Sequence, residues 1–218
     1  MTGIVATAAA RIILLPGAFS TAGDFATARF GEALAERGLD VDLLVIDLAL
    51  TSVTDRSILG RLRAGPLRDA RAAGCESVWL GGVSLGAFVA LALAERFPGE
   101  VDGLCLIAPY LGTRMVSAEI ARAGGLARWP CATVGEEDEE RRIWKFLRTS
   151  NVRRPPIHLG YGRGDRFADS QGLLAAVLPA DSVDVIDGSH DWPTWRTLWE
   201  RFLDQWPAHA PASLRSRL

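Results

Sequence analysis

The stretch Ser77–Gly86, SVWLGGVSLG, joins a strand to a helix through a turn of glycine and serine. The apolar run Ser77–Gly81 is typical of a buried strand, and the Ala- and Leu-rich run Leu85–Phe97, which ends at Pro-Gly, is typical of a buried helix. Between them stands GVSLG at 82–86. A Gly-x-Ser-x-Gly string in this setting predicts a sharp turn that raises the Ser84 hydroxyl above the edge of a sheet.

The glycines of this turn have a physical role. The serine takes a strained backbone conformation, and the residues two before and two after it lie too close to their neighbours to carry side chains. Gly82 and Gly86 occupy those positions. The alternative is an ordinary turn of small residues with an incidental serine, which the direct strand–turn–helix context disfavours. Ser84 is therefore a candidate nucleophile.

Short apolar runs alternate with helical patterns on both sides of this turn. The other predicted strands are Arg11–Leu15, Val41–Ile46, Val101–Ile107, Ile157–Tyr161 and Ser182–Ile186. The other predicted helices are Asp24–Arg37, Asp55–Ala73, Ser170–Leu178 and Thr194–Trp206. Most of the strands are apolar on both faces, as in a parallel sheet that helices cover on both sides. The pattern predicts an α/β fold with a doubly wound, mainly parallel sheet of about six strands.

The length of 218 residues predicts a single domain. The segment 108–156, between the fourth and fifth strands, is longer than a simple crossover needs, and we expect a small cap-like insertion there. Its acidic run, Glu136–Glu140, is typical of a solvated helix face. We expect residues 207–218 to form a loose C-terminal tail.

Composition excludes several classes of protein. Lys+Arg 24 against Asp+Glu 26 argues against a nucleic-acid partner, and no apolar stretch is long enough to span a membrane. The three cysteines, without paired spacing, favour reduced thiols in a cytoplasmic protein. Glycines 81, 82 and 86 lack dinucleotide-binding spacing, and no cluster of ligand-type side chains indicates a metal, so we expect no cofactor and no metal.

A serine hydroxyl needs a base, which is usually histidine, and the chain has three. His158 stands inside an apolar strand and is interpreted as a core residue, and His209 falls in the expected tail. His190, in GSHDW at 188–192, follows the last predicted strand. Active sites of open α/β sheets lie at the carboxyl ends of the strands, so His190 is the candidate base.

A carboxylate must orient the base. Asp165 ends the glycine-rich turn GYGRGD at 160–165, after the fifth predicted strand, and so lies at the same sheet edge. Asp187 and Asp191 are nearer the histidine in sequence but poorly placed to reach around its ring. Asp165 is the preferred candidate, with Asp187 as the main alternative and Asp169 as a more distant one.

The first predicted strand runs into Pro16–Ser20, PGAFS. A Pro-Gly turn there aims the amide of Ala18, or that of Phe19, at the same point as the amide of Leu85. Two such N–H groups would form an oxyanion hole, which stabilises the negative charge of an acyl-transfer intermediate. The alternative is an ordinary strand-to-helix loop, which the three other elements at this edge disfavour.

Residues Arg11–Trp206 resemble the α/β-hydrolase superfamily, whose chain order is Ser–Asp–His. The motifs that carry the resemblance are LLPGAFS (14–20), GGVSLG (81–86), GYGRGD (160–165) and GSHDW (188–192). HDWPTW at 190–195 is similar to the histidine segment of some esterases and acyltransferases of the superfamily. The chain departs from the pattern at Pro16, where a histidine is common, and in a reduced N-terminus without the antiparallel strands of larger members.

The resemblance implies a serine hydrolase that cleaves a small-molecule carboxylic ester or thioester through an acyl-enzyme, with Ser84, Asp165 and His190 as its triad. A serine at the turn disfavours haloalkane dehalogenase and epoxide hydrolase chemistry, which uses aspartate there. Two alternatives stay open. An acyltransferase would use the same residues, whereas a non-catalytic binding module on this fold would not require an intact triad.

Phe19, Tyr110 and Trp192 are the expected substrate contacts, since all three are aromatic and follow strands near the candidate triad. Leu111, Trp129 and Trp144 of the insertion are further pocket candidates, although they would serve equally well to pack the insertion onto the core. The chain leaves no room for a large lid. We therefore expect an open site that favours small or extended substrates.

Overall fold

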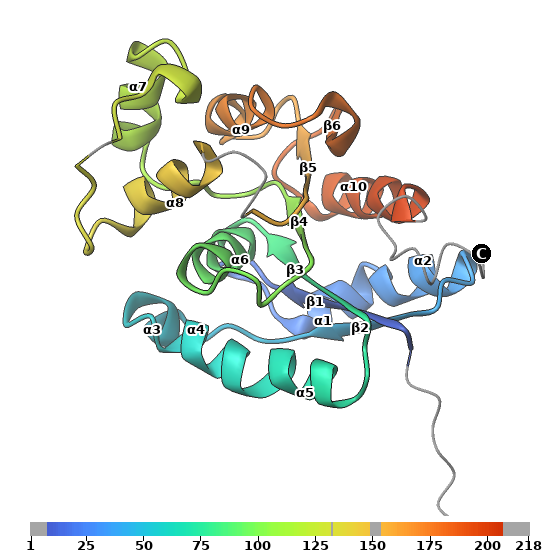
Figure 1. The fold of residues 1–218 in the computed structure, drawn as a ribbon. Coiled ribbons are helices and arrows are strands. Elements are labelled where there is room, and N and C mark those ends of the chain that lie inside the picture. Colours follow the sequence, from blue (N-terminus) through green and yellow to red (C-terminus); the bar gives the residue numbers. More distant parts are fainter. Residues whose placement is uncertain (1–7, 132, 149–153, 207–218) are drawn as a thin grey trace, which may run out of the picture.

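The computed structural model describes residues 8–131, 133–148 and 154–206 and contains a six-stranded sheet in which every neighbouring pair of strands is parallel (Figure 1). The strand order is β2-β1-β3-β4-β5-β6. The strands are β1 (Ala10–Leu15), β2 (Val41–Val45), β3 (Ser77–Val83), β4 (Gly103–Ile107), β5 (Ile157–Gly162) and β6 (Val183–Ile186). This topology confirms the doubly wound α/β fold.

Helices cover both faces of the sheet (Figure 1). One face carries α1 (Ala22–Thr27), α2 (Phe30–Glu36) and α10 (Trp192–Asp204). The other face carries α4 (Ser57–Leu62), α5 (Arg68–Ala72), α6 (Leu85–Arg96), α7 (Arg114–Arg122), α8 (Glu139–Arg148) and α9 (Ala168–Ala175). The remaining elements are α3 (Leu50–Thr54), the π-helical turn η1 (Arg63–Leu67) and the 3-10 turns η2 (Leu126–Arg128) and η3 (Ala180–Ser182).

The side chains of each central strand contribute to two hydrophobic cores, one on each face of the sheet. In β1, Ile12 and Leu14 pack against the α1–α2–α10 layer, whereas Ile13 and Leu15 pack against the opposite layer. Side chains of a strand alternate between the two faces of its sheet, so a strand buried on both sides must be apolar throughout. This is why the strands were recognisable as continuous apolar runs.

Two predicted helices are interrupted. The expected helix Asp24–Arg37 is divided into α1 and α2, because Arg29 adopts a left-handed conformation with φ of 61°. The expected helix Asp55–Ala73 begins only at Ser57 and widens into the π-helical turn around Pro66. Proline lacks an N–H and crowds the carbonyl four residues earlier, so the wider turn accommodates it.

The segment 108–156 contributes α7, η2 and α8. Helix α8 packs on α6, and α7 packs on α9. Trp129 and Trp144 are fully buried and donate their indole N–H groups to Glu119 (2.7 Å) and to the carbonyl of Leu111 (2.9 Å). Of the two interpretations of these tryptophans and of Leu111, packing is therefore favoured over pocket lining, because all three side chains are buried in the hydrophobic core.

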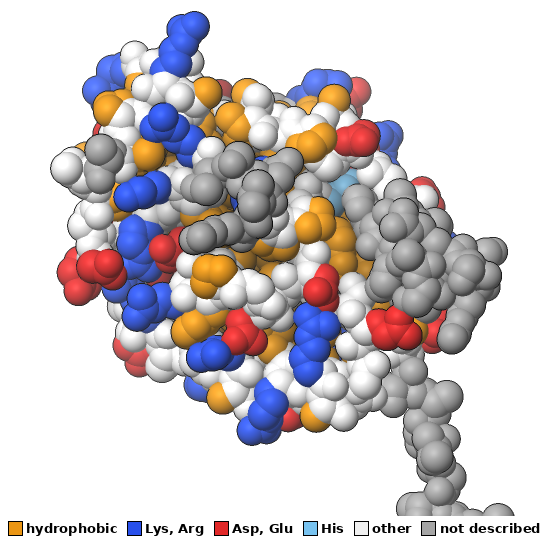
Figure 2. All heavy atoms as spheres, in the orientation of Figure 1, with side chains coloured by type: hydrophobic (Ala, Val, Ile, Leu, Met, Phe, Trp, Pro, Cys, Tyr) orange, Lys and Arg blue, Asp and Glu red, His pale blue; other side chains and the backbone are white. Residues whose placement is uncertain are grey.

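The face of the molecule seen in Figure 2 intersperses basic and acidic side chains. Within the described ranges, no helix combines the length and the apolar character that crossing a membrane demands. The same residues contain no group of three or more His, Cys, Asp or Glu side chains placed to hold a metal ion. The expected tail, 207–218, lies outside the described residues.

Candidate active site

Ser84 stands at the sharp turn between β3 and α6, with φ of 52° and ψ of −114°. Its N–H donates to the carbonyl of Ile107 (3.1 Å), and its carbonyl accepts the N–H of Tyr110 (3.1 Å). These two bonds tie the turn to β4 and to the loop that follows it. A left-handed φ is unfavourable for a residue with a side chain, so the surrounding structure must hold Ser84 in place.

Gly82 and Gly86 leave the space that this turn needs. A Cβ atom on either glycine would overlap the carbonyl oxygen of Leu15, at the end of β1. The close approach of β1, β3 and α6 therefore depends on the absence of side chains at these two positions.

Gly86→Ala is expected to destabilise the protein by about 3 kcal/mol, because the added methyl group meets a backbone oxygen that cannot rotate away. Urea denaturation measures the change in the free energy of unfolding. Gly60→Ala in α4 is the matched control. No heavy atom lies within 4 Å of a Cβ at Gly60, so we expect that variant to gain about 0.5–1 kcal/mol. Equal stability of the two variants would contradict the steric explanation.

A continuous chain of hydrogen bonds joins Ser84, His190 and Asp165. His190 Nε2 lies 3.0 Å from Ser84 Oγ, and His190 Nδ1 lies 2.7 Å from Asp165 Oδ2. The side chain of Asp165 is fully buried, and that of His190 is 10% exposed. Because a carboxylate accepts only, Nδ1 carries the proton in this pairing and Nε2 presents its lone pair to the serine hydroxyl.

Among the carboxylates considered in the sequence, Asp165 is the one that hydrogen-bonds to the imidazole of His190. Asp187 is almost fully exposed and lies beside Arg163, and Asp169 is exposed in the first turn of α9. Asp191 accepts the N–H of Thr194 (3.0 Å) at the start of α10, and hydrogen bonds with Thr194 lower the pKa of the Asp191 carboxyl.

The other histidines lie elsewhere. His158 is buried in β5, with Nε2 3.2 Å from Asp184 Oδ2 and its ring against Phe202, which agrees with its interpretation as a core residue. His209 lies outside the described residues.

The loop after β1 lies over the serine. A Cβ at Gly17 would lie 3.5 Å from Cβ of Ser84, and a hydrogen bond from Ser20 N–H to the Gly17 carbonyl (3.2 Å) closes a turn that has Ala18 and Phe19 at its corners. Leu85 is the first residue of α6, where N–H groups have no acceptor within the helix. Both sequence-predicted amide donors, Ala18 and Leu85, are thus in segments adjacent to Ser84.

Two aromatic rings enclose His190. Phe167 and Trp195 each lie 5.1 Å from the imidazole centroid, at 87° and 86° to its plane. Phe167 also donates its backbone N–H to Asp165 Oδ1 (2.8 Å). Neither residue was a sequence candidate. For Trp195, the only available signal was its place in HDWPTW, one helical turn into α10.

The expected substrate contacts have different environments. Tyr110 is half-buried between the rings of Phe88 and Phe167, each 5.5 Å away, and its hydroxyl donates to Glu140 (3.4 Å). Burial and the charge of Glu140 raise the pKa of Tyr110.

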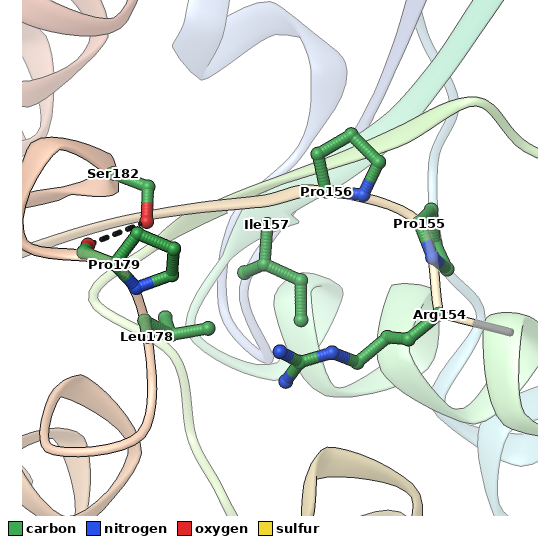
Figure 3. A pocket seen from close by; sticks show the side chains of 7 residues that line it. All are labelled: Arg154, Pro155, Pro156, Ile157, Leu178, Pro179 and Ser182. Carbon is green, nitrogen blue, oxygen red and sulfur yellow. Dashed lines mark hydrogen bonds between the residues drawn. The ribbon is translucent and has the colours of Figure 1, made fainter. Parts of the chain in front are cut away.

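Phe19 is 95% exposed, whereas Trp192 is half-buried against Phe25. A hollow of about 220 Å³ at the opposite, amino-terminal edge of β5 is shown in Figure 3. Arg154 extends across it towards Leu178, and Ile157 begins β5 there. Since Asp165 follows the carboxyl end of β5, this hollow is no part of the candidate site.

The fold described above has counterparts among solved structures. S-formylglutathione hydrolase FrmB of Staphylococcus aureus is 13% identical, with 89% of this chain and 79% of that chain covered and a TM-score of 0.56. A ferulic acid esterase is 12% identical, with 88% and 82% covered and a TM-score of 0.58. A monoacylglycerol lipase of Paleococcus ferrophilus is 15% identical, with 92% and 95% covered and a TM-score of 0.52.

At these identities the likeness establishes the fold alone. A comparison with curated proteins found no match. The sequence model of the alpha/beta hydrolase family, in contrast, matches residues 12–217, which is nearly the whole chain. The chain therefore belongs to the alpha/beta hydrolase family.

Proposed function

We propose that the protein is a serine hydrolase that cleaves a carboxylic ester or a thioester of a small molecule through an acyl-enzyme intermediate. The observation that carries the proposal is the hydrogen-bonded chain Ser84–His190–Asp165 at the carboxyl edge of the sheet. A nucleophile, a base and a buried carboxylate in this order are the parts that acyl transfer requires.

In the first half of the proposed reaction, Ser84 Oγ attacks the carbonyl carbon and His190 Nε2 accepts the hydroxyl proton. Asp165 holds the imidazole in the required tautomer and stabilises its positive charge. As the tetrahedral intermediate collapses, the C–O or C–S bond breaks and His190 gives the proton to the leaving oxygen or sulfur. Water then attacks the acyl-enzyme with His190 again as base, which releases the acid and restores Ser84.

The amides of Ala18 and Leu85 are the proposed donors to the developing oxyanion. The start of α6 adds the positive end of the helix dipole to the same place. Tyr110 and Trp192 are proposed as walls for the substrate, and Phe19 as a residue of the rim. The names of the similar structures cited above include hydrolases of esters and of a thioester, which supports the choice of these two bond types as first candidates.

A fluorophosphonate probe tests the chemistry without knowledge of the substrate. We expect Ser84 of the folded protein to displace fluoride from the probe and to bond to its phosphorus. Mass spectrometry should then find the phosphonyl group on the peptide that contains Ser84. The heat-denatured protein is the control and should not react, since Ser84 is activated only by the folded arrangement. A folded protein that stays unlabelled, or that is labelled at another serine, would sink the proposal.

A further inference from the structure

A hollow of about 350 Å³ lies between α1 and α10, and we call it the α1–α10 hollow. It is lined by Asp24, Thr27 and Ala28 of the first helix region and by Trp192, Pro193 and Arg196 of the last. Both walls belong to helices that follow segments of the candidate site along the chain. Helix α1 follows the loop that contains Ala18, and α10 begins two residues after His190. Its volume is within the range typical of small-molecule sites.

The aromatic residue in the lining of the hollow is Trp192, whose ring packs against other aromatic rings. Its ring makes edge contacts with Phe25 (5.1 Å between centroids) and with Trp195 (4.9 Å), and Trp195 in turn contacts the ring of His190. Trp192 is thereby connected to the candidate base through one intervening ring, that of Trp195. An aromatic ring that its neighbours already hold binds an apolar group with little loss of side-chain entropy.

The two charged side chains that line the hollow, Asp24 and Arg196, already have partners within the protein. Asp24 accepts hydrogen bonds from the N–H (2.7 Å) and the hydroxyl (3.0 Å) of Thr21. Arg196 donates to Glu200 (2.9 Å) and to the carbonyls of Ala28 and Arg29. These interactions leave the indole, the proline ring and the small side chains as the surface that a ligand meets, which favours an uncharged, apolar occupant.

The proposed chemistry determines which part of a substrate lies on this side. His190 Nε2 takes the proton from Ser84 Oγ and must hand it to the leaving oxygen or sulfur, so that atom has to approach Nε2. The leaving group therefore lies on the side of Ser84 that carries the histidine. The start of α10, and with it Trp192 and Pro193, belongs to that side.

We propose that the α1–α10 hollow binds the alcohol or thiol portion of the substrate, and that this portion is a bulky apolar aryl or alkyl group. The inference rests on the proposed function and specifies its substrate class. In the acylation step, the bond between Ser84 Oγ and the acyl carbon forms, the bond from that carbon to the leaving atom breaks, and the proton passes through His190. The released alcohol or thiol occupies the hollow before it dissociates.

A pair of reversed esters tests the assignment. 2-Naphthyl acetate carries the bulky ring on the leaving group, whereas ethyl 2-naphthoate carries it on the acyl group. Thr27→Phe places a new ring in the hollow from an exposed position and is expected to lower kcat/KM for 2-naphthyl acetate about tenfold relative to 2,2,2-trifluoroethyl acetate. The kcat/KM for ethyl 2-naphthoate, also taken relative to 2,2,2-trifluoroethyl acetate, should not fall in this variant.

Thr54→Phe is the matched control. Thr27 and Thr54 are both exposed, both end a short helix, and both donate their hydroxyl to the carbonyl four residues earlier. The control variant should keep the wild-type ratio between the two acetates. The proposal would be overturned if both variants lost the same kcat/KM for 2-naphthyl acetate. It would also be overturned if Thr27→Phe lowered kcat/KM more for ethyl 2-naphthoate than for 2-naphthyl acetate, or changed neither value.

Direct binding separates this proposal from the one on which it rests. 2-Naphthol should bind to the wild-type protein and quench tryptophan fluorescence, and Thr27→Phe should weaken that binding about tenfold. This measurement does not depend on turnover. A protein that binds 2-naphthol in this manner but resists fluorophosphonate would refute the hydrolase and retain the hollow, whereas a labelled protein without this binding would refute the hollow alone.

Discussion

Replacing Ser84 with alanine is expected to reduce hydrolysis of a p-nitrophenyl ester by about a million-fold in kcat, leaving the residual rate that substrate binding and oxyanion stabilisation supply. The reason is geometric: Ser84 Oγ is the hydroxyl within hydrogen-bond distance of His190 Nε2. The variant should stay folded, because the substitution removes one oxygen and leaves the turn unchanged. Steady-state kinetics, together with circular dichroism, measure both properties.

Ser117→Ala is the control for this experiment. Ser117 is a half-buried serine of α7 whose hydroxyl donates to the carbonyl of Arg114 (3.2 Å), away from the candidate triad. The variant should hydrolyse the ester at the wild-type rate. If Ser84→Ala retained comparable activity, Ser84 would not be the nucleophile and the proposed mechanism would fail.

Asp165→Asn has the second largest expected effect, a loss of about ten thousand-fold in kcat. The buried carboxylate accepts a hydrogen bond from His190 Nδ1 (2.7 Å). An amide that turns its NH₂ group to Nδ1 favours the opposite tautomer, which leaves Nε2 protonated and unable to accept the serine proton. The measurement is kcat at saturating ester, with the wild type measured in parallel.

Asp169→Asn, four residues further along the chain at an exposed position, is the control and should leave kcat near the wild-type value. Together the two variants distinguish the proposed acid from a general effect of lost negative charge in this region. A small effect of Asp165→Asn would show that the carboxylate does not orient the base.

The sheet could be predicted from the sequence because its four central strands are buried on both faces and stand out as continuous apolar runs. The interruptions of the helices could not. Arg29 lies within an unbroken helical pattern, and nothing in that pattern indicates the left-handed conformation that separates α1 from α2. Pro66 was visible in the sequence, but whether a proline ends a helix or is accommodated by a wider turn depends on the packing around it.

The three residues of the candidate triad could be predicted because each follows the carboxyl end of a strand, and such ends meet at one edge of a parallel sheet. Phe167 and Trp195 could not, since their contacts with His190 depend on loop and helix conformations that no short motif specifies. Trp129 and Trp144 show the converse case. An aromatic residue in an insertion suits a pocket or a packed core equally well, and only burial distinguishes the two.

The carbonyl of Leu15, against which Gly82 and Gly86 pack, bears on which parts of the candidate site can vary in sequence. One peptide group belongs both to the strand that supports the nucleophile turn and to the start of the loop that carries the Ala18 amide. The Ser84 hydroxyl and the N–H groups proposed to bind the oxyanion are therefore fixed to a common rigid frame. If the proposed function holds, substitutions in α1, α7, α8 and α10 can change which molecule enters while the spacing of the proposed reacting groups stays the same.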